Sequence, residues 1–160
     1  MRNTKIHTPP SLQLDKQLCF ALHSASMAMT KTYKPLLKPL GLTYPQYLVM
    51  LLLWEADGLS VQDLGARLYT DSGTLTPLLK RMADAGWVTR TRDAEDERRV
   101  LIHLTPAGRS LHRRALSIPN GILKAAQCDL EQVQSLTRQV QQLRQQLSQQ
   151  LLAEQTASRS

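Results

Sequence analysis

The segment from residue 59 to residue 105 constrains the fold more than any other part of this 160-residue chain. Ser60 is followed three residues later by Asp63, which is the spacing of a capping box at the start of a helix. Three apolar residues recur there at helical spacing, Val61, Leu64 and Leu68. The pattern predicts a short helix that ends in a turn over residues 69 to 71.

A second helix is predicted to begin at Asp71 or Ser72 and to stop at Ala85-Gly86. Pro77 is expected near its start, because a proline inside a helix removes a backbone hydrogen bond. Its apolar residues, Leu75, Leu78, Leu79 and Met82, would form the buried face. The polar residues expected on the other faces are Thr74, Thr76, Lys80 and Arg81.

Two strands with a charged tip are predicted to follow. Val88 to Arg92 forms the first strand, and apolar residues alternate in the return strand from Val100 to Leu104. The tip from Arg92 to Arg99 has no glycine and is too long and polar for a tight turn, so we expect it to project as a wing. A solvated charged loop would explain the tip alone.

Two helices followed by such a wing are typical of a winged helix-turn-helix. In that motif the second helix reads base edges in the major groove, and an arginine on the wing enters the narrow minor groove, where negative potential is concentrated. The net charge of +7 suits a polyanion but would fit RNA or an anionic membrane nearly as well, so the order of elements decides in favour of DNA. Ser72 joins the predicted DNA contacts because it opens the reading helix.

The composition predicts one mainly α-helical domain with a small β-hairpin. The chain is 42% hydrophobic but has a single Phe, which indicates an aliphatic core. It has no apolar run long enough to cross a bilayer, and its first ten residues lack the apolar core of a signal peptide, so we expect a cytoplasmic protein without a membrane partner. In that compartment its two cysteines are expected to be reduced.

The end of the chain predicts a homodimer. Seven apolar residues form a narrow stripe at spacings of three and four, Leu130, Val133, Leu136, Val140, Leu143, Leu147 and Leu151. A helix of about two dozen residues is about 36 Å long, which exceeds what the winged module can cover. Packing on the N-terminal helix of the same chain would explain the stripe but not the length. Residues 1 to 11 and about 153 to 160 are expected to be ragged ends.

The order of motifs resembles the MarR regulators over most of the chain. The motifs are Leu-Thr-Tyr-Pro-Gln-Tyr at residues 42 to 47, Asp-Glu-Arg-Arg-Val at 96 to 100 and Leu-Thr-Pro-Ala-Gly at 104 to 108. Residues 17 to 22, 33 to 37 and 71 to 80 are similar to the organic hydroperoxide resistance regulators, OhrR, in their two-cysteine branch. The resemblance implies one domain over residues 1 to 160, with dimerisation and sensing helices at 12 to 58 and 105 to 153 around a DNA-binding module at 59 to 104.

The resemblance also implies a redox mechanism. A homodimeric repressor would bind an inverted-repeat operator when reduced and release it when an organic hydroperoxide oxidises Cys19. Tyr33 and Tyr44 would donate hydrogen bonds to the Cys19 thiolate from the other subunit, and Cys128 would attack the sulfenic acid to form an intersubunit disulfide. On the wing, Asp96 would hold the Arg98 guanidinium towards the minor groove, with Arg99 as a further DNA contact.

The residues around the cysteines leave other interpretations open. Cys19 would extend an apolar helix face formed by Leu14, Leu18, Leu22 and Ala25, and as a small hydrophobic residue it could simply be buried there. His23 at i+4 would favour a thiolate if protonated, whereas Asp15 at i−4 would oppose it. Phe20, Met27 and Met29 either form an apolar entrance for hydroperoxides or belong to a core. Cys128 is either the resolving thiol or an unpaired surface residue, in which case a small-molecule thiol would cap Cys19.

Two rival functions follow from the same residues. A MarR-type regulator of a small non-oxidant ligand would keep the DNA chemistry, and changing both cysteines would leave its induction intact. A thiol peroxidase would require turnover with a reductant and would leave the winged helix unexplained, so we do not expect an enzyme. His103 and His112 are isolated in the sequence, which predicts no metal site, and no cofactor motif is present.

Overall fold

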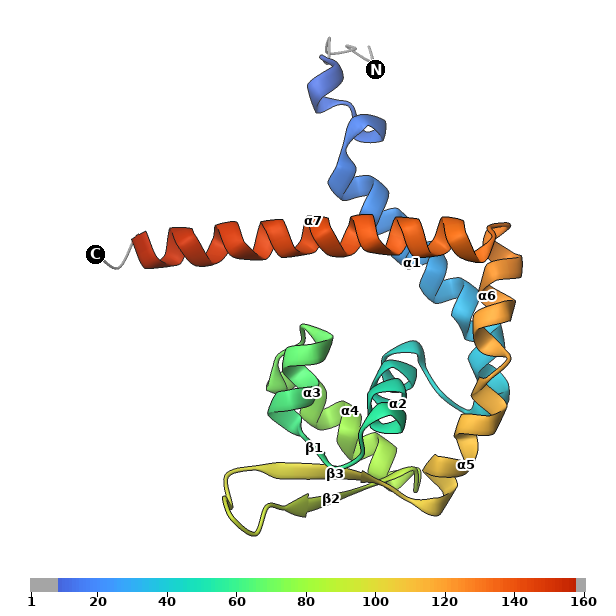
Figure 1. The fold of residues 1–160 in the computed structure, drawn as a ribbon, viewed down its shortest axis with the longest axis vertical. Coiled ribbons are helices and arrows are strands. Elements are labelled where there is room, and N and C mark those ends of the chain that lie inside the picture. The colour runs from blue at the N-terminus through green and yellow to red at the C-terminus, as the bar shows by residue number, and fades with distance from the viewer. Residues whose placement is uncertain (1–8, 158–160) are drawn as a thin grey trace, which may run out of the picture. The chain divides into compact units, whose positions relative to one another are not determined.

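A computed structural model describes residues 9 to 157, and Figure 1 labels its helices and strands. The chain divides into two compact units, residues 1 to 118 and 119 to 160. The predicted ragged ends lie in part outside the described residues, at 1 to 8 and 158 to 160. The prediction was wrong for the rest, because Pro10–Leu12 forms a 3-10 turn and the last helix continues to Ala157.

The first unit contains most of the elements, and a long helix dominates the second. The helices of the first unit are α1 (Leu18–Leu37), α2 (Tyr44–Glu55), α3 (Val61–Leu68), α4 (Ser72–Asp84) and α5 (Pro106–Ala115). Its strands are β1 (Leu59–Ser60), β2 (Val88–Arg92) and β3 (Val100–Leu104), and its 3-10 turns are η1 (Pro10–Leu12), η2 (Leu14–Lys16) and η3 (Lys38–Leu40). Helix α6 (Ile118–Ala126) leads into α7 (Leu130–Ala157).

The helix-turn-helix has the predicted boundaries. Ser60 caps α3 by accepting a hydrogen bond from the Asp63 amide at 3.1 Å, and the Asp63 carboxylate accepts one from the Ser60 amide at 3.2 Å, which completes a capping box. Tyr69 ends α3 in the left-handed conformation. The buried residues of α4 are the four apolar ones that its periodicity predicts.

Pro77 is not near the start of its helix, so that prediction was wrong. Helix α4 begins at Ser72, which makes Pro77 its sixth residue. Because proline has no amide hydrogen, the Gly73 carbonyl accepts no helical hydrogen bond from residue 77. The Asp71 carboxylate caps the helix at this start, because it accepts hydrogen bonds from the Thr74 amide at 2.9 Å and the Thr74 hydroxyl at 2.8 Å. These bonds lower the pKa of Asp71.

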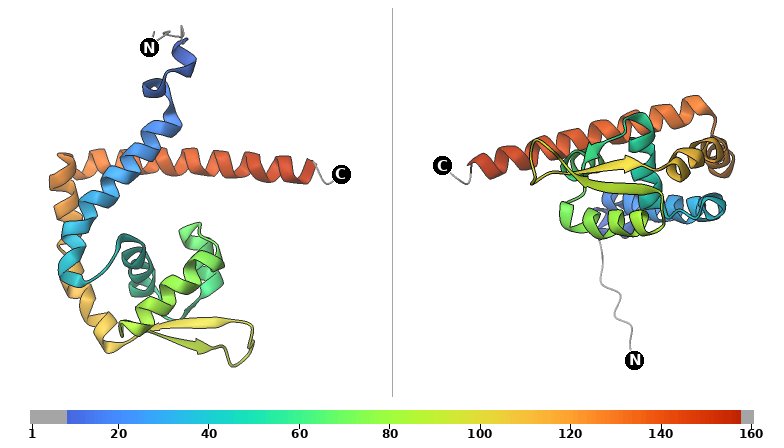
Figure 2. Two further views of the ribbon diagram at one scale, coloured as in Figure 1. Left: turned by 180° about the vertical axis from the view of Figure 1, so that it is seen from behind. Right: turned by 90° about the horizontal axis from the view of Figure 1, so that it is seen from below.

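The hairpin belongs to a three-stranded antiparallel sheet with the order β1-β3-β2. Strands β2 and β3 pair from Val88 with Leu104 to Arg92 with Val100, as the sequence predicts. The two-residue strand β1 adds a third member and was not predicted, because two residues are too few to show a periodicity. Figures 1 and 2 show α2, α3 and α4 on one side of this sheet.

The core of the first unit is aliphatic, as the composition predicts. Its most deeply buried side chains include Met50 and Leu53 from α2, Leu79 from α4 and Ile102 from β3. Helix α2 is apolar on nearly every face and buries six of its twelve residues. The winged helix-turn-helix therefore has a complete hydrophobic core within one chain.

The N-terminal helix differs from the packed apolar face that the sequence predicts. Helix α1 begins at Leu18, and Leu14 lies before it in the separate turn η2. The side chains expected to form its packed face lie open in the single chain, with Leu14 59% and Leu18 60% exposed. Leu37 is the one buried residue of α1. The sequence correctly predicted that these side chains are apolar, but no other part of the single chain covers them.

The stripe on α7 is equally uncovered. Leu136, Leu147 and Leu151 are each more than half exposed. At 28 residues α7 is about 42 Å long, which is longer than the sequence predicts. Among residues 9 to 157, no single helix is long and apolar enough to span a membrane, although the bent pair formed by residues 18 to 40 and 44 to 55 passes the same test by length and composition.

Candidate DNA-binding surface and cysteine site

The outer face of α4 presents every residue predicted for the reading helix. All five side chains are exposed, namely Ser72, Thr74, Thr76, Lys80 and Arg81. Two of the hydroxyl groups already donate hydrogen bonds within the helix, from Thr74 to Asp71 and from Thr76 to the Ser72 carbonyl at 2.7 Å. The threonines therefore offer methyl groups and acceptor lone pairs, which suit the thymine methyl and base amino groups of a major groove.

The wing is ordered by hydrogen bonds within its own tip. The Asp93 amide donates to the Arg99 carbonyl at 2.9 Å, and the Arg99 amide donates to the Asp96 carbonyl at 2.9 Å. The Asp96 carboxylate accepts from the backbone amide of Arg98 at 3.0 Å. This differs from the expected pairing of Asp96 with the Arg98 guanidinium. Asp96 orients Arg98 through the main chain and leaves its side chain exposed.

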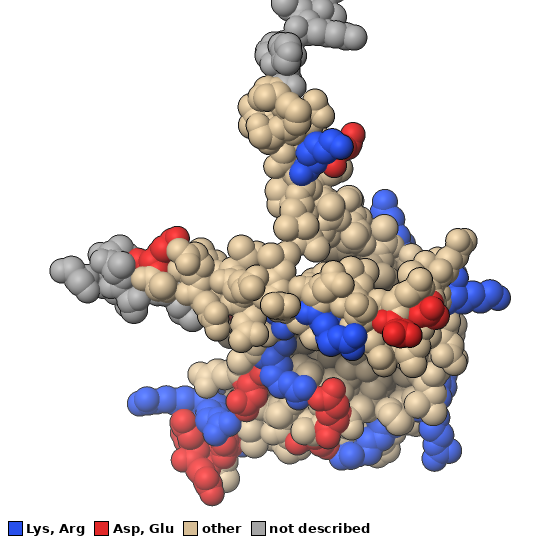
Figure 3. Space-filling view, turned by 45° about the horizontal axis from the view of Figure 1, so that its top comes forward, with Lys and Arg blue, Asp and Glu red and all other residues tan. Residues whose placement is uncertain are grey.

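Arg99 also forms ion pairs that the sequence did not predict. Its guanidinium lies 3.4 Å from the Asp63 carboxylate of α3 and 3.8 Å from that of Asp93, so it ties the wing to the helix-turn-helix. The pKa of Asp63 is lowered, first by its hydrogen bonds from Ser60 and then by Arg99. Figure 3 shows acidic and basic side chains side by side at the lower left, where the wing projects.

A hollow of about 310 Å³ separates the wing from the two helices. It is lined by Ser60, Val61, Gln62, Ser72, Thr76, Arg90, Arg98, Arg99 and Val100. Four of these residues are predicted DNA contacts, and the structure brings them together. Gln62 and Arg90 were missed. The alternation of β2 gives Arg90 the same face as Val88 and Arg92, and only the packing of α3 against the sheet shows that it borders this hollow.

The two cysteines lie in different units and are both free thiols. Cys19 is the second residue of α1 and is exposed, which excludes inert burial in the single chain. Asp15 lies in η2, outside the helix, so the expected i−4 contact with Cys19 was wrong. Cys128 follows α6 and is partly buried, and its thiol lies 3.2 Å from the Ala126 carbonyl.

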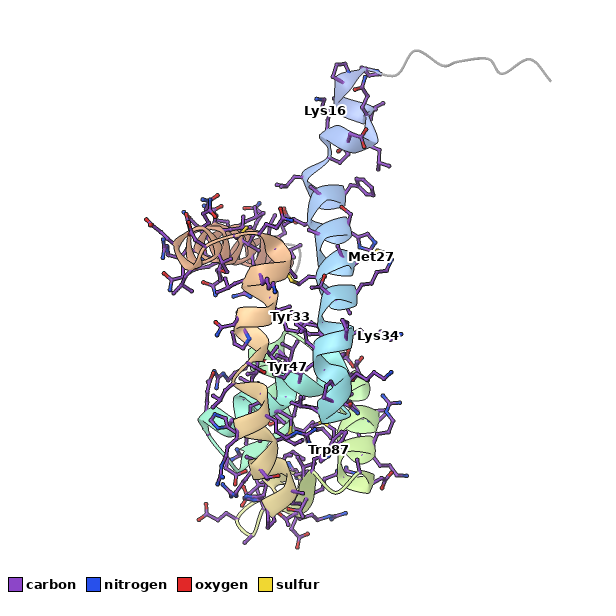
Figure 4. The ribbon with its side chains drawn as sticks, turned by 90° about the vertical axis from the view of Figure 1, so that its right-hand side faces the viewer. Lys16, Met27, Tyr33, Lys34, Tyr47 and Trp87 are labelled. Carbon is purple, nitrogen blue, oxygen red and sulfur yellow. The ribbon has the colours of Figure 1, made fainter. Side chains whose placement is uncertain are left out.

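Tyr33 and Tyr44, predicted to serve the thiolate, lie against each other. Their ring centroids are 4.6 Å apart, and the Tyr47 ring lies 5.8 Å from that of Tyr33. Burial, followed by its two tyrosine neighbours, raises the pKa of Tyr33 to about 12, and burial also raises the pKa of Tyr44. Both phenols therefore keep their protons at neutral pH. Figure 4 shows Tyr33 on the side of α1 that faces Tyr47, with Lys34 on the other side.

Cys19 cannot meet this tyrosine pair within one chain. Tyr33 lies fourteen positions after Cys19 in the continuous helix α1, which corresponds to about 21 Å along the axis. A hydrogen bond requires a separation near 3 Å. A site that joins the thiolate to the tyrosines therefore needs a second copy of the chain.

The histidines have structural surroundings. His112 packs edge-on against Trp54, with ring centroids 5.4 Å apart, and the His103 ring lies beside Gly58. Asp57 links the end of α2 to β3 and α5, because its carboxylate accepts a hydrogen bond from the Leu104 amide at 2.8 Å and pairs with Arg109. In the part of the chain that the structure describes, no cluster of three or more metal-ligating side chains occurs.

Comparison with known proteins decides the family. Residues 42–100 match the model of the MarR family. The chain is also 54% identical over 127 residues to the organic hydroperoxide resistance transcriptional regulator of Bacillus subtilis, which covers 78% of this chain and 86% of that protein. The chain belongs to the MarR family. Its members are transcriptional regulators and not enzymes, which agrees with the winged helix-turn-helix seen here.

Solved structures of MarR proteins share the fold. The reduced AbfR of Staphylococcus epidermidis bound to DNA is 32% identical and covers 87% of this chain and 98% of its own, with a TM-score of 0.69. A disulfide-formed AbfR is 34% identical and covers 83% and 93%, with a TM-score of 0.57. Both structures show that the chain shares the fold of a protein that binds DNA.

Proposed function

We propose that this MarR protein is a homodimeric repressor that binds an inverted-repeat operator when reduced and releases it when an organic hydroperoxide oxidises Cys19. One observation carries the proposal: the exposed Cys19 thiol lies about 21 Å along α1 from Tyr33, whose protonated phenol packs against that of Tyr44 from α2. A twofold dimer gives each contact twice, so two copies of α1 running in opposite directions would place Cys19 of each at the tyrosines of the other. The name of the relative from Bacillus subtilis supports the hydroperoxide as the inducer.

The uncovered apolar residues support the dimer. On α1, Leu18, Met27 and Met29 are at least 41% exposed. On α7, five of the seven stripe residues are exposed, namely Leu130, Leu136, Val140, Leu147 and Leu151. Apolar surfaces of this extent mark an interface in a protein whose winged module already has a core. We assign residues 12 to 58 and 105 to 153 to dimerisation and sensing, and residues 59 to 104 to DNA binding.

The chemistry begins at the Cys19 thiolate. The sulfur attacks the peroxide, the O–O bond breaks, and the alkoxide takes up a proton and leaves as an alcohol while Cys19 becomes a sulfenic acid. The hydroxyl groups of Tyr33 and Tyr44 donate hydrogen bonds to the thiolate before the reaction. A donor must be protonated for this task, and burial moves the pKa of Tyr33 still further above neutral pH.

Cys128 of the partner subunit completes the switch. Its thiol attacks the sulfenic sulfur, a sulfur–sulfur bond forms, and the hydroxyl group leaves as water. The disulfide joins a thiol of the first unit to one of the second and pulls on the helices that set the spacing of the two α4 helices. Because half-sites lie about 34 Å apart, a small rotation prevents both α4 helices from docking together.

In this proposal, both α4 and the wing contact the operator. The side chains of Ser72, Thr74, Thr76, Lys80 and Arg81 contact the major groove and its flanking phosphates. Arg98 enters the minor groove, and Asp96 and Arg99 hold the wing in position. Gln62 and Arg90 line the hollow beside them and contact the backbone phosphates.

One experiment tests the redox proposal. The reduced protein receives one equivalent of an organic hydroperoxide and is run on a non-reducing gel with peptide mapping. We expect a covalent dimer that contains a Cys19–Cys128 peptide, that dithiothreitol reverses, and that no longer binds operator. The Cys19→Ser variant should bind operator and ignore peroxide, and Cys128→Ser should stop at an oxidised Cys19 monomer on the gel.

Other outcomes separate the rivals. A mixed disulfide on Cys19 with unchanged Cys128 would replace Cys128 by a small-molecule thiol as the resolving group. If Cys19 stays unmodified while the double cysteine variant is still induced in cells, the protein is a regulator of a non-oxidant ligand. Repeated turnover of peroxide with a thiol reductant would instead indicate a peroxidase.

A further inference from the structure

Three phenol side chains gather where α1 meets α2. The Tyr33 and Tyr44 ring centroids are 4.6 Å apart with the ring planes tilted by 39°, and the Tyr47 ring lies 5.8 Å from that of Tyr33. Aromatic pairs in proteins have centroids about 4.5 to 7 Å apart, so the Tyr33–Tyr44 pair is at the short end of this range. At this separation, ring carbons of one residue contact those of the other.

Exposure to solvent divides the tyrosines. Tyr33 and Tyr44 are partly exposed, whereas Tyr47 is buried and only 4% exposed. A dissolved oxidant can therefore reach the first two phenols of the cluster but is excluded from the third. The fourth tyrosine of the chain, Tyr69, is 66% exposed and lies in the turn after α3. The Tyr33–Tyr44 pair thus combines a short ring separation with access from solvent.

Phenols in contact undergo a characteristic one-electron reaction. A radical that takes the hydroxyl hydrogen atom leaves a phenoxyl radical, whose unpaired electron is shared with the ring carbons next to the carbon that bears oxygen. Two such radicals in contact form a carbon–carbon bond. We infer that Tyr33 and Tyr44 are a modification site at which alkylperoxyl radicals, formed from organic hydroperoxides and ferric ions, join the two rings as dityrosine.

The reaction balances with two radicals for each new bond. A hydroperoxide becomes a peroxyl radical when it gives one electron to a ferric ion and one proton to water. Each peroxyl radical takes one hydrogen atom from one hydroxyl group and leaves as a hydroperoxide. Once the ring carbons have joined, the hydrogen on each joined carbon moves to the oxygen, so both phenols are restored and the protein has lost two hydrogen atoms. Tyr33 and Tyr44 are both protonated at neutral pH, so each carries the hydrogen atom that this step removes.

Coupling would change the site that we propose for Cys19. The new bond joins the C-terminal half of α1 to the first residue of α2 and ties the two hydroxyl groups together. Coupled phenols are more acidic than separate ones, because one hydroxyl group donates a hydrogen bond to the phenolate beside it. That negative charge would oppose the Cys19 thiolate and make the sensor insensitive. This consequence rests on the proposed function, whereas the coupling does not.

The test uses a protein without thiols. Full-length Cys19→Ser/Cys128→Ser is exposed in air to a water-soluble azo compound that releases alkylperoxyl radicals. We expect dityrosine fluorescence to develop in protein that still runs as a monomer on a denaturing gel. A chymotryptic digest, which cuts the chain between Tyr33 and Tyr44, should contain two joined peptides whose mass is two hydrogen atoms below their sum.

Single substitutions in the same background localise the bond. Tyr33→Phe should lower the yield of the joined peptides at least tenfold, because phenylalanine has no hydroxyl hydrogen atom to give. Tyr47→Phe removes a phenol from the same cluster, and Tyr69→Phe removes an exposed phenol from the turn after α3. Each of these two controls should keep at least half of the parent yield. Circular dichroism before treatment checks that each variant is folded.

Three results would overturn the proposal. They are oxidation of Tyr69 without joined Tyr33–Tyr44 peptides, joined peptides that occur only in covalent dimers, and equal losses of yield in Tyr33→Phe and Tyr47→Phe. Because the protein has no cysteine, none of these results depends on whether it senses hydroperoxides through Cys19.

A second measurement tests the consequence for sensing. The wild type is coupled while its cysteines are protected as mixed disulfides, and dithiothreitol then frees them. Cys19 should react with an organic hydroperoxide at least tenfold more slowly than in protein that was protected and freed without coupling. An unchanged rate would contradict the role that we propose for the tyrosines, and the modification site would stand without it.

Discussion

The winged module and the helices that flank it differ in how complete they are within one chain. The module from Leu59 to Leu104, together with α2 packed against it, has a buried core, capped helices and a wing held by Arg99. Helices α1 and α7 instead expose apolar side chains along their length. DNA reading is therefore encoded locally, whereas the sensing site that we propose requires residues from two chains.

The largest effect should come from the α7 stripe. Leu136→Glu/Leu147→Glu places two carboxylates in the predicted interface and should yield a monomer that retains helical circular dichroism. Losing the second half-site contact should weaken operator binding by about 10²- to 10⁴-fold, because the two half-site contacts are no longer linked within one molecule. Light scattering and gel shift measure both effects.

The control for that variant lies on the opposite face of α7. Gln142→Glu/Gln149→Glu adds the same charge to exposed polar positions and should remain dimeric with nearly unchanged operator affinity. A stripe variant that stays dimeric would show that the interface lies elsewhere in the chain.

A core substitution should show that the module is complete by itself. Leu79 is fully buried, so Leu79→Ala should lower the free energy of unfolding by about 2–5 kcal/mol. Leu14→Ala removes an exposed side chain and should change it by less than about 0.5 kcal/mol. The two substitutions are each introduced into the monomeric Leu136→Glu/Leu147→Glu variant, and urea unfolding measures the change in the free energy of unfolding. Equal effects would contradict the distinction between a closed module and open helices.

The wing arginine should have an intermediate effect. Arg98→Ala should weaken operator binding by about 1–3 kcal/mol and lower the slope of log affinity against log salt by about 1, because one cation leaves the groove. Arg138→Ala removes a cation from exposed α7 and should leave the slope unchanged. An unchanged slope for Arg98→Ala would remove Arg98 from the DNA contacts.

The smallest effect should come from the Asp63 cap. Asp63→Asn weakens the capping box and the tie to Arg99, and caps of this kind contribute about 1 kcal/mol. Since the pKa of Asp63 is lowered in the folded protein, its contribution is present above the ordinary value of 3.8 and is lost as the pH falls below it. Acid unfolding should show this loss in the wild type and a flatter profile in Asp63→Asn. Asp84→Asn, at an exposed carboxylate of α4, serves as the control.

The sequence predicted what local patterns determine and missed what packing determines. Helix α4 and both hairpin strands have the predicted boundaries because caps, periodicity and turn chemistry lie within a few residues of one another. The surroundings of Cys19 could not be predicted in the same way, because the break between η2 and α1 has no proline or glycine to mark it. Arg90 was missed because only the packing of α4 against β2 and of α3 against β3 makes it part of the surface.

The tyrosine pair shows the limit most clearly. Tyr33 and Tyr44 come from different helices, and no periodicity relates them, so their contact at 4.6 Å could be expected only from the family resemblance. The structure adds what the resemblance alone does not measure, which is that Cys19 of the same chain lies too far along α1 to reach them.

A mixed dimer tests the central claim, that the sensing site is shared between two chains. One subunit carries Cys19→Ser and the other Tyr33→Phe/Tyr44→Phe, with two affinity tags to purify the mixed form. The account predicts that the one remaining Cys19, which faces the intact tyrosines of its partner, reacts with hydroperoxide as fast as wild type, while the Tyr33→Phe/Tyr44→Phe homodimer reacts slowly. A mixed dimer as slow as that homodimer would contradict the account.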